Sequence, residues 1–243
     1  MKNKISTLII FSIIIVFLCG YNTKFTVIEC QSYYDQIISK GTKEEKIIAL
    51  TFDDGPHPKY TNEILDLLNE YDAKATFFVL GKMAELYPDI IKRQWKEGHE
   101  IGNHTYSHIN PNKVSKEELL DEYNKTQEII ASLTGSTPKL FRPPYGSFNK
   151  DIIEIVDMDH SIIVLWSANQ DSKDWSNPKV ENIVNSTLSN IENGDIILFH
   201  DYVYYKSSHT IEALKKILPI LKSQGYRFVT VSELMNITLN CNN

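Results

Sequence analysis

Two neighbouring carboxylates, Asp53 and Asp54, stand at the end of an apolar run and are followed directly by Gly55-Pro56. Two like charges this close repel each other, and a bound cation is the usual way to hold both. An Asp-Gly sequence is also common in solvated turns, where the side-chain oxygens bond the backbone. The segment alone therefore indicates either a cation site or an ordinary turn.

Two histidines at a spacing of four residues, His104 and His108, follow another apolar run. Imidazoles at this spacing can reach one metal ion if the segment forms a helical turn. With a carboxylate from a second strand end, they would form an Asp-His-His set that leaves coordination positions open for water and substrate. A single histidine is more often a surface or core residue, so the argument depends on the pair.

Later apolar runs are followed by further polar or aromatic residues. Arg142 precedes Pro143-Pro144, which restrict the backbone, and its guanidinium suits a carboxylate partner. The others are Asp171, Asp174, Trp175, His200 and Asp201. Each could also be ordinary: Arg142 as a surface residue of a rigid loop, Trp175 as a packed side chain, and His200 as a polar residue with its hydrogen bonds satisfied. Their common position at the ends of predicted strands favours one shared site.

The elements that would position these residues alternate from about residue 46 onward. Short apolar runs predict strands, and segments with apolar residues at helical spacing lie between them. The predicted strands are 47–52, 75–79, 99–103, 139–142, 161–167, 195–200 and 227–231, and the predicted helices include 83–97, 116–133 and 210–223. Ser115 with Glu118 predicts a capping box at the start of 116–133.

About seven such units predict an α/β fold with a parallel sheet, either closed as a barrel or open and doubly wound. Residues 46–236 contain no linker rich in Pro, Gly or Ser and no internal repeat, which favours one domain. In these folds the chemistry lies at the C-terminal ends of the strands. The candidate residues all fall there.

In this order, the motifs resemble those of the polysaccharide deacetylases, also called carbohydrate esterase family four. They are TFDDGP (51–56), HTYSH (104–108), RPPYG (142–146), DSKDW (171–175) and LFH (198–200). The resemblance implies a distorted (β/α) barrel with about seven parallel strands. It also implies a hydrolase that removes N-acetyl groups from peptidoglycan, a chitin oligosaccharide or poly-N-acetylglucosamine. In one departure, the loop between Trp166 and Asp171 is longer than in many members.

The same resemblance implies a metal centre and a base. Asp54, His104 and His108 would hold one divalent metal ion, zinc in the first place, with cobalt, nickel or manganese as alternatives. Asp53 would be the general base, and Arg142 would hold it in place.

The remaining implied roles concern the acid and the pocket. His200 would be the general acid, with Asp174 setting its orientation and charge. The backbone N–H of Tyr145 would stabilise the oxyanion, and Trp175 and Leu198 would line the pocket for the acetyl methyl. Two alternatives stay open: a hydrolase of an acetyl ester or small cyclic amide, and a catalytically inactive carbohydrate-binding wall protein.

The composition excludes several kinds of partner. Hydrophobic residues make up 42% of the 243 residues and charged residues 23%, as in ordinary globular proteins. A net charge of −6 argues against a nucleic-acid partner and against adsorption to an anionic membrane surface. We expect a monomer that binds a polysaccharide.

The N-terminal residues have the pattern of an export signal. Lys2 and Lys4 precede an apolar stretch over 5–19, which predicts a signal peptide or N-terminal membrane anchor within 1–30. The protein would then be extracellular, in the cell wall or on the outer face of the membrane.

The predicted boundaries are a linker over 31–45, a catalytic domain over 46–236 and a tail over 237–243. Cys30 and Cys241 flank the domain and would be free to form a disulfide after export, or to remain two thiols.

Overall fold

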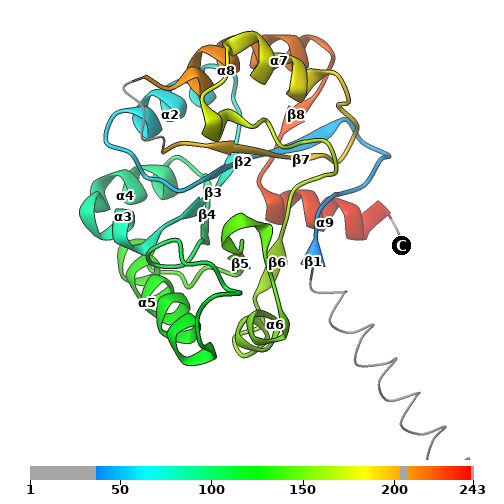
Figure 1. Ribbon diagram of the computed structural model, residues 1–243. Helices are drawn as coiled ribbons and strands as arrows, with labels where there is room; N and C mark the ends of the chain where they lie inside the picture. The colour runs from blue at the N-terminus through cyan, green and yellow to red at the C-terminus, as the bar shows by residue number, and fades with distance from the viewer. Residues whose placement is uncertain (1–36, 203–206, 242–243) are drawn as a thin grey trace, which may run out of the picture. The chain divides into compact units, whose positions relative to one another are not determined.

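Strands and helices alternate along the chain, as the periodicity predicted (Figure 1). The computed structural model describes residues 37–202 and 207–241, and from Ile38 onward they form one compact unit. The strands are β1 (Ile37–Ile38), β2 (Ile47–Asp53), β3 (Ala75–Val79), β4 (Glu100–Asn103), β5 (Leu140–Phe141), β6 (Ile162–Val164), β7 (Ile196–His200) and β8 (Arg227–Phe228). The helices are α2 (Tyr60–Glu70), α3 (Gly81–Leu86), α4 (Pro88–Lys96), α5 (Lys116–Thr134), α6 (Lys150–Asp157), α7 (Val180–Leu188), α8 (His209–Ser223) and α9 (Val231–Cys241), with 3₁₀ turns η1 (Pro144–Gly146) and η2 (Asp174–Ser176).

The strands form one curled sheet, a half-barrel of parallel strands. Their order is β1-β6-β5-β4-β3-β2-β7, and β8 pairs with the start of β2. Helices cover the outer face: α2, α7 and α8 lie beside β2 and β7, and α3, α4 and α5 lie beside β3 and β4 (Figure 1). This arrangement confirms the predicted distorted (β/α) barrel.

One edge of β7 pairs with β2, and its other edge forms backbone contacts with segments that are not strands. Lys40 forms an antiparallel bridge with Asp195, just before β7. Further along the same edge, which faces away from β2, Ser167 N donates to the Ile196 carbonyl at 3.0 Å, and Asp171 forms a parallel bridge with Leu198. These contacts take the place of a continuous ladder between β7 and the far end of the sheet.

β2 shows how the sheet separates core from site. All seven of its residues are buried, because helices cover one face and the interior of the half-barrel covers the other. Alternate residues Ile48, Leu50 and Phe52 belong to the apolar cluster under the helices. On the inner face, the apolar residues near the start of β2 give way to Thr51 and Asp53 near its end. The inside of the half-barrel is therefore apolar at one end and polar at the other.

The predicted helix over 83–97 is wrong, because it is two helices. α3 ends at Leu86 and α4 begins at Pro88, with Tyr87 between them at φ −131° and ψ 56°. A proline disfavours helical backbone at the preceding residue and supplies no N–H to the turn before it. Pro88 instead occupies the first position of α4, where no N–H is needed.

The folded region also extends beyond residues 46–236. β1 belongs to the sheet, and α9 continues to Cys241. A two-residue strand has no periodic pattern, so the sequence did not reveal it. By contrast, the serine half of the capping box predicted for α5 is confirmed, since Ser115 Oγ accepts from Glu118 N at 3.2 Å.

Within residues 37–202 and 207–241, no helix combines the length and the apolarity that crossing a bilayer requires. The predicted signal or anchor segment over 1–30, including Cys30, lies outside the described residues. Cys241 is exposed and has no disulfide partner among the described residues.

Candidate active site

The predicted motifs meet around one cavity of about 380 Å³ at the C-terminal ends of the strands. Its lining comprises Asp53, Asp54, His104, His108, Tyr145, Gly146, Trp166, Asp171, Trp175, Leu198 and His200. Arg142 and Asp174, the two other predicted site residues, are buried. Both contact a residue of the lining.

Asp54, His104 and His108 form the group of described residues that could hold a metal ion, with their ligand atoms all within 4.8 Å of one another. Asp54 Oδ1 lies 3.5 Å from His104 Nε2 and 3.4 Å from His108 Nε2. This oxygen is buried and has no hydrogen-bond partner among the described residues. Burial would raise the pKa of Asp54, but contact with His104 and the charges of the neighbouring histidines outweigh it and lower the pKa to about 2.

His104 is oriented by the strand beside it. Its Nδ1 lies 2.6 Å from the carbonyl oxygen of Arg142, and because a carbonyl only accepts, Nδ1 must carry the proton. Nε2 is then the nitrogen free to bind a metal, on the side of Asp54. Two imidazole nitrogens and an unpartnered buried carboxylate oxygen directed at one point suit a divalent first-row metal.

The loop that carries the two histidines is not a helical turn. Residues 104–108 are irregular, and Thr105 and His108 have positive φ values of 67° and 63°. The two imidazole rings are nevertheless 5.2 Å apart. Asp54 also has a positive φ, 75°, so its side chain leaves the direction set by β2. Rare backbone conformations of this kind gather at functional sites, where surrounding contacts enforce them.

Asp53 is held by a buried arginine. Arg142 is fully buried, and its Nη1 donates to Asp53 Oδ1 at 2.8 Å and to Thr51 Oγ1 at 2.8 Å. Its Nε donates to the Val164 carbonyl at 3.1 Å. The other oxygen of Asp53, Oδ2, lies 3.8 Å from His104 Nε2. One oxygen is thus committed to the guanidinium, and the other lies beside the Asp-His-His group.

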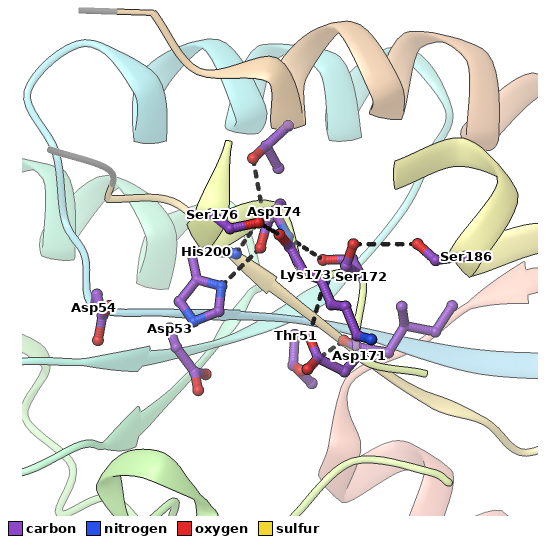
Figure 2. Close-up of polar contacts among 12 residues, drawn as sticks. Thr51, Asp53, Asp54, Asp171, Ser172, Lys173, Asp174, Ser176, Ser186 and His200 are labelled. Carbon is purple, nitrogen blue, oxygen red and sulfur yellow. Dashed lines mark hydrogen bonds and ion pairs between the residues drawn. The ribbon is translucent and has the colours of Figure 1, made fainter. Parts of the chain in front are cut away.

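His200 is coupled to a second buried carboxylate. Asp174 Oδ1 lies 2.7 Å from His200 Nδ1, and Asp174 Oδ2 accepts from His200 N and from Thr210 Oγ1, both at 2.8 Å. In Figure 2 the imidazole is drawn between Asp53 and Asp174, with a dashed line joining it to Asp174. Burial would lower the pKa of His200, but the charge of Asp174 and its hydrogen bond outweigh it and raise the pKa to about 9.

The backbone of the loop between Trp166 and Asp174 is bonded to β7. Ser172 N donates to the Leu198 carbonyl at 3.2 Å, and Ser186 Oγ donates to the Ser172 carbonyl at 3.1 Å (Figure 2). The loop therefore runs along the strand that ends in His200.

Aromatic rings form the rim of the cavity. Tyr145 has φ 62° and an exposed fraction of 63%, and its ring lies 4.7 Å from that of His108. Trp175 is 56% exposed, whereas Leu198 is buried in the wall. The sequence reasoning gave no role to Trp166, which also lines the cavity and packs so closely on Gly146 that a Cβ there would lie 2.8 Å from its ring. The position of Trp166 at the end of the predicted strand 161–167 is the sequence feature that could have identified it as a site residue.

This fold and site define a class: a parallel (β/α) half-barrel whose strand ends bear a candidate metal-binding group and two buried charged pairs. Residues 40–159 match the sequence profile of the polysaccharide deacetylases. A peptidoglycan-N-acetylglucosamine deacetylase of Bacillus cereus is 48% identical over 191 residues, which are 79% of this chain and 89% of the relative. The chain belongs to the polysaccharide deacetylase family.

Solved structures agree with this membership. The crystal structure of a peptidoglycan N-acetylglucosamine deacetylase in complex with 4-naphthalen-1-yl-N-oxidanyl-benzamide is similar with a TM-score of 0.79 and 41% identity, covering 83% of this chain and 93% of that one. A family 4 acetyl xylan esterase from Clostridium thermocellum in complex with a cobalt ion has a TM-score of 0.73 and 36% identity, covering 79% and 91%.

Proposed function

We propose that this protein is a metal-dependent deacetylase that hydrolyses the N-acetyl groups of N-acetylglucosamine-type residues in peptidoglycan. The observation that carries the proposal is the convergence of Asp54, His104 and His108 with Asp53 and His200 around one cavity. The similarity to a peptidoglycan-N-acetylglucosamine deacetylase supports the choice of polymer over chitin oligosaccharides and poly-N-acetylglucosamine.

Asp54 Oδ1, His104 Nε2 and His108 Nε2 are the proposed ligands. A divalent ion bound there would polarise the acetyl carbonyl and acidify a water molecule. Mixed nitrogen and oxygen ligands favour zinc, with cobalt, nickel or manganese as alternatives.

Asp53 is the proposed general base. Its Oδ1 is bonded to Arg142, which leaves Oδ2 to take a proton from the attacking water. The guanidinium is fully buried, and its bond to Oδ1 holds the carboxylate in one direction.

His200 is the proposed general acid. When the bond between the acetyl carbon and the sugar nitrogen breaks, that nitrogen needs a proton, and the imidazolium supplies it. Asp174 accepts from Nδ1, which leaves the Nε2 proton for the cavity. The products are acetate and a free amino sugar.

Tyr145, Trp175 and Leu198 are the proposed substrate contacts. The backbone N–H of Tyr145, in its left-handed turn, would donate to the oxyanion, and the other two side chains would surround the acetyl methyl. Exposed rings at the rim would pack on sugar rings.

The test is acetate release from peptidoglycan, chitin oligosaccharides and poly-N-acetylglucosamine, with and without a chelator. Asp53→Asn is the matched control, because it removes the base and keeps the size of the side chain. We expect chelator-sensitive release that is highest with peptidoglycan. Release that the chelator and Asp53→Asn both leave unchanged would refute the proposal.

An acetyl-ester substrate is the second candidate, because one similar structure is an acetyl xylan esterase. Acetylated xylan in the same assay separates the two. Asp53 and His200 are both present, which argues against an inactive carbohydrate-binding protein.

We also propose that residues 1–30 act as a signal peptide or membrane anchor, which would place the catalytic unit outside the cytoplasm. We expect the catalytic unit to be a monomer. The basic start and the apolar stretch support export.

A further inference from the structure

Asp201 is a buried carboxyl group next to the site that none of the roles above uses. It follows His200 directly and is 1% exposed. Its backbone N donates to the Asp53 carbonyl at 3.2 Å. Its Oδ2 accepts from Thr61 Oγ1 at 2.6 Å, and its Oδ1 has no hydrogen-bond partner among the described residues.

The carboxyl group occupies the space beside Gly55. A Cβ at position 55 would lie 2.2 Å from both Asp201 oxygens, so only glycine fits there while Asp201 keeps its place. The same carboxyl reaches the chain after Gly55 through Thr61, whose Oγ1 accepts from His57 N at 2.7 Å. Asp201 therefore contacts the chain on both sides of Asp54: before it at Asp53, and after it at Gly55 and, through Thr61, at His57.

We infer that Asp201 is a positioning residue, which holds the segment from Asp53 to His57 at a fixed place relative to His200. The proposed base and acid lie on neighbouring strands, β2 and β7, and must reach the same substrate atoms. Misplacement of a reacting group by about 1 Å can cost about 10²-fold in rate. The consequence for catalysis rests on the proposed function, whereas the placement of the segment does not.

The chemistry of the carboxyl group suits a steric and hydrogen-bonding role. Burial raises the pKa of Asp201 to about 7, and the charges of Asp54 and Asp53 act in the same direction, against the hydrogen bond from Thr61. An asparagine has the same shape and can accept from Thr61 Oγ1. Asp201→Asn should therefore preserve the function, and Asp201→Ala should not.

The matched control is Asp195, a buried aspartate just before the other end of β7, paired with Lys40 at 3.1 Å. For Asp201→Ala we expect kcat to fall about 10–100-fold with KM changed less than about threefold, and for Asp201→Asn a kcat within about threefold of the wild type. Asp195→Ala should lower Tm and leave kcat unchanged. A full kcat in Asp201→Ala, an equal loss in Asp195→Ala, or no rescue by Asp201→Asn would overturn the inference.

Two further measurements keep the test decisive. If Asp201→Ala does not fold, Thr61→Val removes the hydroxyl donor and keeps the shape, and a full kcat in that variant overturns the inference. Crystal structures of the metal-loaded variants provide a readout besides activity. We expect the Asp53 carboxylate to move relative to His200 in Asp201→Ala and not in Asp195→Ala, and an unchanged position would overturn the inference. Absence of acetate release by the wild type would refute only the proposed function.

Discussion

Asp53 and Asp54 are adjacent and identical, yet we assign them different tasks, and replacing each in turn with asparagine tests this assignment. Asp54 Oδ1 lies within 3.5 Å of both histidine Nε2 atoms. Asp53 approaches only His104, at 3.8 Å, and its other oxygen is bonded to Arg142. Asp54→Asn should therefore weaken metal binding, whereas Asp53→Asn should preserve it.

The expected loss of activity in Asp53→Asn is about 10²–10⁴-fold in kcat, the range for a positioned general base. At about 1.36 kcal/mol per factor of ten, this equals roughly 2.7–5.4 kcal/mol of transition-state stabilisation. Removing one partner of a buried ion pair can also cost about 3–5 kcal/mol of stability. Because the asparagine oxygen can still accept from Arg142, we expect a smaller cost and a lower Tm, so kcat must be measured well below the Tm of the variant.

The assay combines acetate release across a pH series with metal content by mass spectrometry on the same preparations. Some activity of Asp54→Asn should return at high metal concentration. If Asp53→Asn lost the metal and Asp54→Asn kept it, the two roles would be reversed and the reasoning refuted.

Three other predictions follow from the site and the chain ends. Burial would lower the pKa of His200, but Asp174 raises it to about 9. The proposed acid is therefore protonated at neutral pH, and activity should fall as the pH rises through about 9. Asp174→Asn should move this alkaline limb to lower pH, and an unmoved limb in the pH–rate profile would contradict the pairing. His104→Ala should abolish stoichiometric metal binding while circular dichroism stays native, and full metal occupancy would rule His104 out as a ligand. If Cys30 and Cys241 form a disulfide after export, non-reducing mass analysis of protein collected outside the cell should detect a peptide pair joined through them, and two alkylated thiols would rule the bridge out.

The residues that bear the proposed chemistry were identified from the sequence because their signals are local. Asp53-Asp54 at a strand end, the His104–His108 spacing and the Arg142-Pro143 pair are each visible within a few residues. The strands and most helices were also predicted, since burial imposes a period along the chain. Parallel strands bring their C-terminal ends to one rim, so a shared site could be inferred before any distance was known.

The backbone at the site was decided by tertiary contacts. The positive φ of Asp54 and the irregular loop of 104–108 oppose local preference, and no pattern in the sequence specifies them. The sequence also does not specify the pairing of the two-residue strand β1 or the position of residues 167–172 along β7. Both depend on the curvature of the sheet.

Contacts between residues far apart in the chain show most clearly what only the tertiary structure decides. Arg142 and Asp53 are 89 residues apart in the chain, and Thr61 and Asp201 are 140 apart. Each pair depends on which strands are neighbours and on their register, since a shift by one residue turns every side chain to the opposite face. Residue types are local, so the sequence by itself determined which groups could act. Whether they meet depends on register and packing summed over the whole sheet, so only the tertiary structure decided that Asp201 lies against Gly55.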